Sequence, residues 1–110
     1  MNKQEAEFLI FKIIEKNPNM TQRQISSELG VSLGKTNFIM RALVNKGLIK
    51  LLNFRRSNNK LGYTYLLTPE GISAKAQLAS DFLDRKSIEY SILKKEIAIL
   101  KDEVKKYDIE

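Results

Sequence analysis

Apolar residues near the N-terminus recur at helical spacing. Asn2 followed by Glu5 fits an N-cap with its capping partner three residues later. The stretch from Ala6 to Ile14 is apolar around most of a helix, and such a helix must be covered on more than one face. One face therefore packs within its own domain, and the other needs a second helix or a partner chain. The Asn-Pro-Asn segment 17–19 ends this helix, because proline disfavours helical conformation in the residue before it.

The next pattern predicts two helices joined by a tight turn. Thr21 with Gln24 is a second capping box, which opens a short helix through about residue 29. Gly30 supplies the left-handed backbone that closes this helix. Ser32 then caps a third helix, residues 33–45. Its inward positions are Thr36, Met40 and Leu43. Two helices joined by a short turn that contains glycine form a helix-turn-helix.

After Gly47 the apolar period changes to about two residues. Segments 48–54 and 63–68 are rich in aliphatic residues, tyrosine and threonine, as strands are. The polar, basic stretch 55–62 between them predicts a β-hairpin with a charged tip. Thr68 and Pro69 fit the N-cap and first position of a last helix, which continues to about residue 107. We therefore predict a mainly α fold with a small β-hairpin: a winged helix-turn-helix domain (residues 1–82) and a C-terminal coiled-coil helix (residues 83–110).

The C-terminal helix carries a heptad repeat. Its a and d positions are Tyr90, Leu93, Ile97, Leu100, Val104 and Tyr107. β-Branched residues at a with leucine at d favour a parallel two-stranded coiled coil. In a parallel pair, glutamates at g face lysines at e of the other chain (Glu89–Lys94 and Glu96–Lys101), and Glu103–Asp108 is the one mismatch. The pattern predicts a homodimer through parallel C-terminal helices. The alternative is a tail folded back on its own domain without a dimer. Ile88, Ile92 and Ile99 lie off this seam and suggest packing against the first helix.

Composition excludes several classes of protein. The chain of 110 residues has neither cysteine nor histidine, so disulfides, thiol nucleophiles and the usual zinc ligands are missing. We predict no catalytic residue, no cofactor and no metal site. No stretch is apolar enough to span a membrane, and the N-terminus lacks the apolar core of a signal peptide. A cytoplasmic binding protein is expected.

Charge is concentrated in the middle of the chain. Residues 19–68 carry eight basic side chains and one acidic side chain, whereas the flanking segments are close to neutral. A polyanion-binding surface has this character, because each neutralised phosphate releases condensed counterions. The alternative is a solvated basic face that keeps the protein soluble. The helix-turn-helix pattern favours the first interpretation.

The segment from Asn17 to Ile72 contains the motifs VSLGKTNF, LVNKGLIK and NFRRSNNKLGYTYLLTPEGI. Together they resemble the MarR-type winged-helix transcriptional regulators. With the coiled-coil tail, the chain is most similar to the small EPS-associated branch, bacterial regulators named for genes of exopolysaccharide synthesis. The resemblance implies a regulator of such genes. The chain is shorter than typical MarR proteins and has one long tail helix in place of their helical dimerisation lobe. The resemblance therefore does not assign their pocket for small phenolic ligands to this chain, and the sequence makes no prediction about an effector.

The outward face of the third helix is the candidate surface for double-stranded DNA. Recognition helices contact base edges with their N-terminal residues. Asn37 can pair with adenine, and Lys35 with guanine or a phosphate. Phe38 either touches a thymine methyl group or packs on the second helix. The candidate DNA-binding residues on this helix are Ser32, Gly34, Lys35, Asn37, Phe38 and Arg41.

Two further groups complete the candidate interface. The hairpin tip would reach the adjacent minor groove or its phosphates through Arg55, Arg56, Asn58 and Lys60. Its alternative role is to protect an edge strand by charge. The second helix offers Thr21, Gln22 and Arg23 at its start, where helix N-termini attract phosphate.

Three functions follow from these features. The first is a homodimeric, sequence-specific DNA-binding regulator. The second is a non-catalytic adaptor that uses the winged helix and the coiled coil as a scaffold. The third is an enzyme that uses carboxylates such as Glu28 or the pair Asp81 and Asp84. The agreement of fold, charge and hairpin favours the DNA-binding regulator.

Overall fold

The computed structural model describes residues 1–55 and 61–107. Its elements are the helices α1 (Lys3–Lys16), α2 (Gln22–Leu29), α3 (Leu33–Asn45) and α4 (Pro69–Lys106) and the strands β1 (Ile49–Arg55) and β2 (Leu61–Leu67). The two strands pair antiparallel, with Ile49 opposite Leu67 and Arg55 opposite Leu61. The order of helices and strands is that of a winged helix-turn-helix with a long last helix, so the predicted fold class is confirmed.

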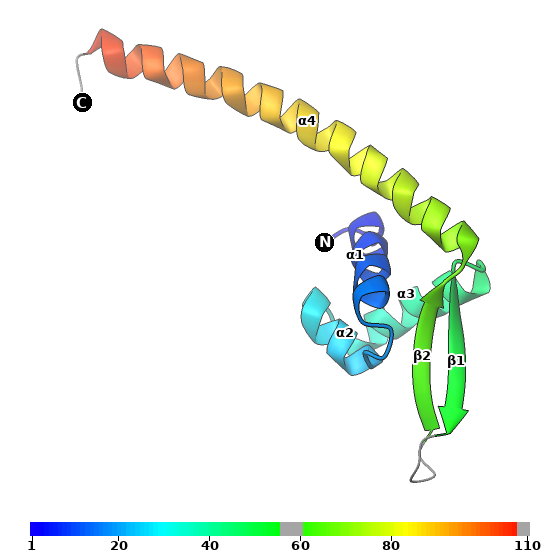
Figure 1. The fold of residues 1–110 in the computed structure, drawn as a ribbon. Coiled ribbons are helices and arrows are strands. Elements are labelled where there is room, and N and C mark those ends of the chain that lie inside the picture. Colours follow the sequence, from blue (N-terminus) through cyan, green and yellow to red (C-terminus); the bar gives the residue numbers. More distant parts are fainter. Residues whose placement is uncertain (56–60, 108–110) are drawn as a thin grey trace. The chain divides into compact units, whose positions relative to one another are not determined.

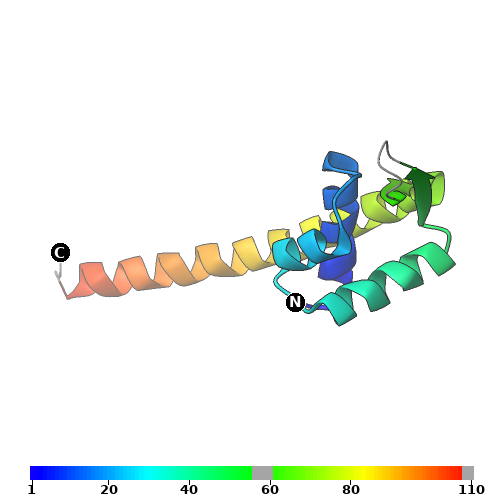
Figure 2. The same ribbon diagram turned by 90° about the horizontal axis from the view of Figure 1, so that it is seen from below.

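The described residues form two compact units, Met1–Leu78 and Ala79–Glu110. In the first unit, α1, α2 and α3 form a cluster with the hairpin beside them (Figure 1). Helix α3 lies along one edge of this cluster (Figure 2), which leaves one of its faces open. The second unit consists of the later part of α4, and the division expected at residue 82 lies within the same helix.

The helix ends are capped by the side chains that the sequence indicates. Each of them accepts the backbone N–H of the residue three positions later: Asn2 Oδ1 from Glu5 at 2.8 Å, Thr21 Oγ1 from Gln24 at 3.1 Å, and Ser32 Oγ from Lys35 at 3.1 Å. Gln24 Oε1 in turn accepts the N–H of Thr21 at 2.9 Å, which completes a capping box. Gly30 closes α2 with a φ of 70°, a left-handed conformation that glycine adopts without steric cost.

The core of the first unit joins all of its elements. Helix α1 contributes the largest share, and the buried apolar residues are Ala6, Ile10, Phe11, Ile14, Ile25, Leu29, Ile39, Met40, Leu43, Ile49 and Tyr65. Thr36, Met40 and Leu43 are buried as the sequence predicts, and Ile39 is a further inward residue of α3. Burying this face fixes α3 by its inner side, so its opposite face is held in a defined orientation.

The start of α4 is fixed against the start of β1. Thr68 Oγ1 accepts the N–H of Gly71 at 3.0 Å, so Thr68 caps α4 as expected. The backbone N–H of Thr68 donates to the Leu48 carbonyl at 3.1 Å. Gly71 is buried, and a Cβ atom there would overlap the Leu48 carbonyl oxygen. The glycine therefore allows a close approach of two backbones rather than an unusual backbone angle.

We expect Gly71→Ala to lower the free energy of unfolding by about 3 kcal/mol, because the new methyl group has no room beside Leu48. For a domain of this size, that change lowers Tm by about 10–20 °C. Circular dichroism melting checks it. Gly34→Ala is the matched control, since an added Cβ meets nothing within 4 Å there, and we expect it to leave Tm unchanged or to raise it slightly. Equal melting of both variants would contradict the steric account.

Strand β2 is also connected to the segment between α1 and α2. The backbone N–H of Tyr65 donates to the Pro18 carbonyl at 3.0 Å, and Thr64 Oγ1 donates to Asn19 Oδ1 at 2.9 Å. These bonds tie the hairpin to the helical cluster at the side from which α2 starts. The relative position of α2 and β2 matters for the candidate site below.

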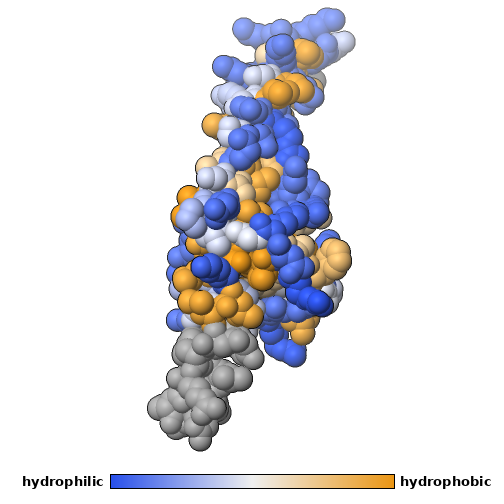
Figure 3. Space-filling model, turned by 90° about the vertical axis from the view of Figure 1, so that its right-hand side faces the viewer, coloured by the Kyte–Doolittle hydropathy of each residue, from blue (hydrophilic) through white to orange (hydrophobic). Residues whose placement is uncertain are grey.

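Helix α4 runs without a break over 38 residues. Within the part of the chain that the structure describes, no helix combines the length and the apolar character needed to span a membrane. Apolar side chains lie at intervals among polar ones along this helix (Figure 3). Its exposed surface is therefore mixed rather than uniformly polar.

Candidate nucleic-acid interface

The open side of α3 carries the predicted base-contacting residues on one surface. We call this surface, formed by Gly34, Lys35, Asn37, Phe38 and Arg41, the recognition face. All of its members are exposed except Asn37, which is half-buried. A shallow groove of about 500 Å³ runs over it, lined by Gly34, Asn37, Phe38, Arg41, Ala42 and Asn45. The structure thus brings these candidates together, and Ser32 lies next to them at the N-cap of the same helix.

Phe38 projects from the recognition face into solvent. Its side chain is 72% exposed, so the alternative in which it packs on α2 is wrong. An exposed aromatic ring on this face is available for an apolar contact with a ligand. A thymine methyl group is the apolar feature that the major groove of DNA offers.

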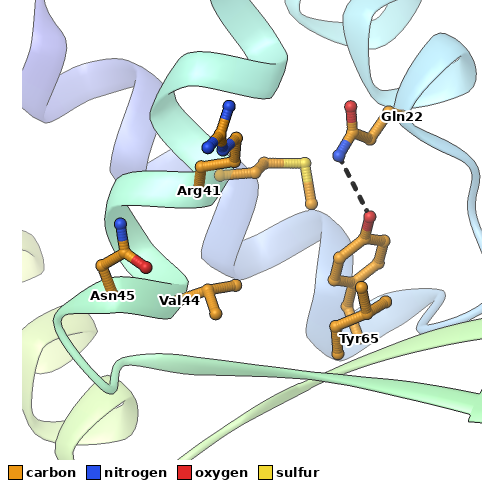
Figure 4. Close-up of a pocket in the computed structure, with 7 residues that line it drawn as sticks. Gln22, Arg41, Val44, Asn45 and Tyr65 are labelled. Atoms are coloured by element: carbon orange, nitrogen blue, oxygen red, sulfur yellow. Dashed lines mark hydrogen bonds between the residues drawn. The ribbon is translucent and has the colours of Figure 1, made fainter.

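Gln22 of α2 connects Asn37 to Tyr65 of β2 through two hydrogen bonds. Asn37 Nδ2 donates to Gln22 Oε1 at 3.0 Å, and Gln22 Nε2 donates to the hydroxyl of Tyr65 at 3.2 Å. Figure 4 shows the second of these bonds, with Gln22 from α2 above the Tyr65 ring from β2. The DNA-backbone contact proposed for Gln22 stays a prediction, but its side chain is engaged in two hydrogen bonds within the protein. Sequence analysis treated Tyr65 only as a strand residue.

A small cavity lies where α2, α3 and the hairpin meet. Its volume is about 210 Å³, and its lining residues are Gln22, Met40, Arg41, Val44, Asn45, Leu51 and Tyr65 (Figure 4). Asn45 also lines the groove over the recognition face. It lies two helical turns after Asn37, where helical spacing could have indicated it. Sequence analysis did not identify Asn45.

Basic side chains also lie around this surface. Arg23 at the start of α2 is exposed, as are Lys35 and Arg41 on α3. None of the three forms an ion pair with a described residue. Unpaired cations on one surface attract a polyanion without first giving up an internal partner.

The hairpin tip lies mostly outside the described residues. Strand β1 ends at Arg55, one residue later than expected. Strand β2 begins at Leu61, two residues earlier than the sequence predicts, so the connecting segment is shorter. Arg56, Asn58 and Lys60 lie outside the described residues, and their predicted role stays a prediction.

The second unit carries a separate apolar surface. We call the residues Tyr90, Leu93, Ile97, Leu100, Val104 and Tyr107 the seam. All six are exposed. The first five recur every three or four residues of α4 and therefore share one side of it, and Tyr107 directly follows the last residue of the helix. The Lys86 ammonium lies 3.2 Å from the Glu89 carboxylate, and the Lys94 ammonium lies over the Tyr90 ring. Ile88, Ile92 and Ile99 are exposed as well, and their packing against α1 stays a prediction.

Comparison with known proteins supports the architecture. Residues 4–50 match a family model described as winged helix-turn-helix DNA-binding. This match runs from α1 to the start of β1 and covers less than half of the chain. No curated protein sequence is significantly similar to the chain.

Solved structures show the same fold. The PcaV transcriptional regulator from Streptomyces coelicolor is 16% identical, with 94% of this chain and 75% of that chain covered and a TM-score of 0.67. A Staphylococcus aureus MepR mutant bound to an oligodeoxyribonucleotide is 21% identical, with 97% and 76% covered and a TM-score of 0.57. Staphylococcus aureus MarR in complex with salicylate and kanamycin is 22% identical over 81% of this chain, with a TM-score of 0.55. The chain spans 56% of the length of that MarR structure. These similarities establish a winged helix-turn-helix fold.

Proposed function

We propose that the chain is a MarR-type transcriptional regulator that binds specific sites in double-stranded DNA as a homodimer. The observation that carries the proposal is the recognition face: an amide, an exposed aromatic ring and unpaired basic side chains on the open side of α3. A major groove admits one α-helix and presents hydrogen-bonding edges and thymine methyl groups to it. The solved structure of a MepR mutant on an oligodeoxyribonucleotide gives a precedent for DNA binding by this fold.

Base contacts and phosphate contacts divide between the residues by their chemistry. Asn37 contacts adenine, Phe38 contacts a thymine methyl group, and Lys35 contacts guanine or a phosphate. Gly34 has no side chain, so the α3 backbone can approach DNA closely. Arg41 binds a phosphate, as do Thr21 and Arg23 at the N-terminus of α2. The Ser32 backbone lies at the end of α3 that enters the major groove of DNA.

The hairpin contributes a second contact. Its basic and polar tip residues, Arg55, Arg56, Asn58 and Lys60, bind the adjacent minor groove or its phosphates. Such contacts add affinity and depend on the width of the minor groove rather than on base edges. They extend the positive surface beyond α3.

The seam pairs two copies of the chain in parallel. Exposed apolar residues at heptad spacing favour burial against an identical helix, and the flanking charges favour the parallel orientation. Because α4 is unbroken, the same register places exposed Leu83 at one further a position. A parallel pair presents two recognition helices to one side of a duplex, for half-sites about 34 Å apart.

The regulated genes follow from the sequence resemblance alone, which points to exopolysaccharide synthesis. The proposal needs no cofactor and assigns no catalytic role to Glu28, Asp81 or Asp84. A protein-interaction adaptor is the competing function, and the same seam would then recruit a different chain.

Selection from a pool of randomised duplexes tests the proposal, together with sedimentation of the protein alone. We expect an enriched motif with two related half-sites about one helical turn apart and a sedimenting species of twice the chain mass. A monomer that enriches no sequence but binds another protein helix would support the adaptor instead.

Replacing Asn37 by alanine should relax base preference at one position of each half-site. The lost pairing with adenine corresponds to about 1–3 kcal/mol of discrimination, whereas affinity for random duplex should stay within about twofold because phosphate contacts remain. Fluorescence anisotropy with the selected duplex and its single-base variants measures both quantities. If the variant lost affinity for the random and the selected duplex equally, Asn37 would not be a base-contacting residue.

A further inference from the structure

We propose that Gln22 and Tyr65 are positioning residues that hold the Asn37 amide in the orientation that binds adenine. Base preference then depends on a buried tyrosine of the hairpin that does not itself lie on the recognition face. The inference rests on the proposed function, because it concerns how the DNA-contacting amide is oriented.

The three side chains come from three different elements. Tyr65 is on β2, Gln22 is in the first turn of α2, and Asn37 is on α3. Gln22 bridges the other two, with 3.2 Å between Nε2 and the Tyr65 hydroxyl and 3.0 Å between Oε1 and Asn37 Nδ2. This chain of two hydrogen bonds, which we call the relay, therefore joins the hairpin to the recognition face.

The polarity of these bonds determines what Asn37 offers to DNA. The Gln22 amide gives an N–H to the tyrosine hydroxyl, so its oxygen faces Asn37. That oxygen takes one of the two Asn37 N–H groups. Asn37 retains its Oδ1 and one N–H, an acceptor and a donor side by side. Adenine presents the matching pair in the major groove, the N6 amino group and the N7 acceptor.

The far end of the relay is firmly anchored. The Tyr65 side chain is only 6% exposed and belongs to the core of the first unit. Its backbone N–H is bonded to the Pro18 carbonyl, close in sequence to α2. An amide attached to such an anchor loses its rotational freedom before DNA binds, so less entropy is lost on binding.

Two conservative substitutions break the relay and keep the apolar part of each side chain. Tyr65→Phe keeps the buried ring and deletes the hydroxyl that faces Gln22 beside the cavity of about 210 Å³ (Figure 4). Gln22→Met keeps the length of the side chain and removes both polar atoms. Gln4→Met is the matched control for Gln22→Met, because it makes the same exchange at an exposed glutamine of α1.

The test is a double-mutant cycle on DNA. The probes are the duplex that the wild-type protein selects from a randomised pool, its version with the Asn37-dependent adenine replaced, and a random-sequence duplex. We expect Tyr65→Phe and Gln22→Met to lower the preference for adenine about fivefold or more. Tyr65→Phe should also keep random-duplex affinity and Tm close to wild type, because Tyr65 is not among the predicted DNA contacts. In an Asn37→Ala background neither substitution should lower the preference for adenine further, because the amide that they would misorient is already absent. Gln4→Met should keep the full preference.

Two results would overturn the relay. One is an adenine preference that Asn37→Ala loses and both relay variants keep. The other is an equal loss of affinity for random and selected duplex in Tyr65→Phe, which marks a merely structural role for its hydroxyl. Failure of the proposed function has a different signature, since the wild-type protein would then enrich no motif at all.

Discussion

Replacing Lys35, Arg41, Arg55 and Arg56 together by alanine should weaken binding to a random-sequence duplex by at least about a thousandfold at 0.1 M salt. Each phosphate contact releases condensed counterions and contributes about 0.9 to the slope of log affinity against log salt concentration. Four lost contacts therefore remove about 3.6 log units at this salt concentration. Salt titrations followed by fluorescence anisotropy measure both the affinity and the slope, which should become shallower.

A control variant with the same loss of charge shows whether binding depends on these four positions or only on the net charge of the protein. Lys3, Lys95, Lys105 and Lys106 are exposed and lie outside residues 19–68. Their combined replacement by alanine lowers the net charge equally, and we expect only a small change in affinity and the same salt slope. If the two quadruple variants bind alike, or if the first binds as the wild type does, the proposed phosphate contacts are wrong.

Most of the fold could be predicted because its signals are local. The caps at Asn2, Thr21 and Ser32 each join residues three apart, so the sequence displays both partners in one short segment. Helix α3 has the predicted bounds because Ser32 begins it and Gly47, with a φ of 74°, follows its end. The inward face of α3 followed from helical periodicity in the same way.

The relations that were missed connect distant positions. Gln22 and Tyr65 are 43 residues apart, and two polar side chains at that separation leave no periodic signal. The need for Gly71 was hidden for the same reason, since the obstructing atom belongs to Leu48. Strand β2 begins earlier than expected because pairing with β1 extends to Leu61 and Gly62, whereas composition alone indicated a turn there. The choice between the two interpretations of Phe38 also depended on its exposed fraction, which the sequence does not reveal.

Introducing aspartate at Leu93 and Leu100 should convert the proposed dimer into a monomer. Both residues occupy d positions of the seam, so a parallel pair would have to bury four carboxylates at its centre, at a cost of several kcal/mol each. When two winged helix-turn-helix domains are linked in a dimer, binding of the first raises the effective concentration of the second at its half-site to the millimolar range. The monomer should therefore bind the selected duplex about 100- to 10,000-fold more weakly. Analytical ultracentrifugation and anisotropy measure the two effects on the same samples.

The neighbouring positions supply a closely matched control. Ile92 and Ile99 are 53% and 63% exposed, against 52% and 63% for Leu93 and Leu100. The double change Ile92→Asp and Ile99→Asp thus adds the same charge and removes similar apolar surface one position away from the seam. We expect this variant to stay dimeric and to bind the selected duplex with about wild-type affinity. Dissociation of both variants alike would show that the interface is not the heptad seam.

A single engineered cysteine tests the orientation of the two helices, because the chain has no cysteine of its own. Val104 lies at an a position near the end of α4. In a parallel, in-register pair the two copies of this residue face each other at a separation that a disulfide spans. Val104→Cys should therefore form a covalent dimer on mild oxidation, and Ile92→Cys, off the seam, should not. In an antiparallel pair residue 104 lies opposite the region of residue 90, far from its own copy. A dimeric Val104→Cys protein that stays uncrosslinked would contradict the parallel arrangement, and with it the placement of two recognition helices on one side of the duplex.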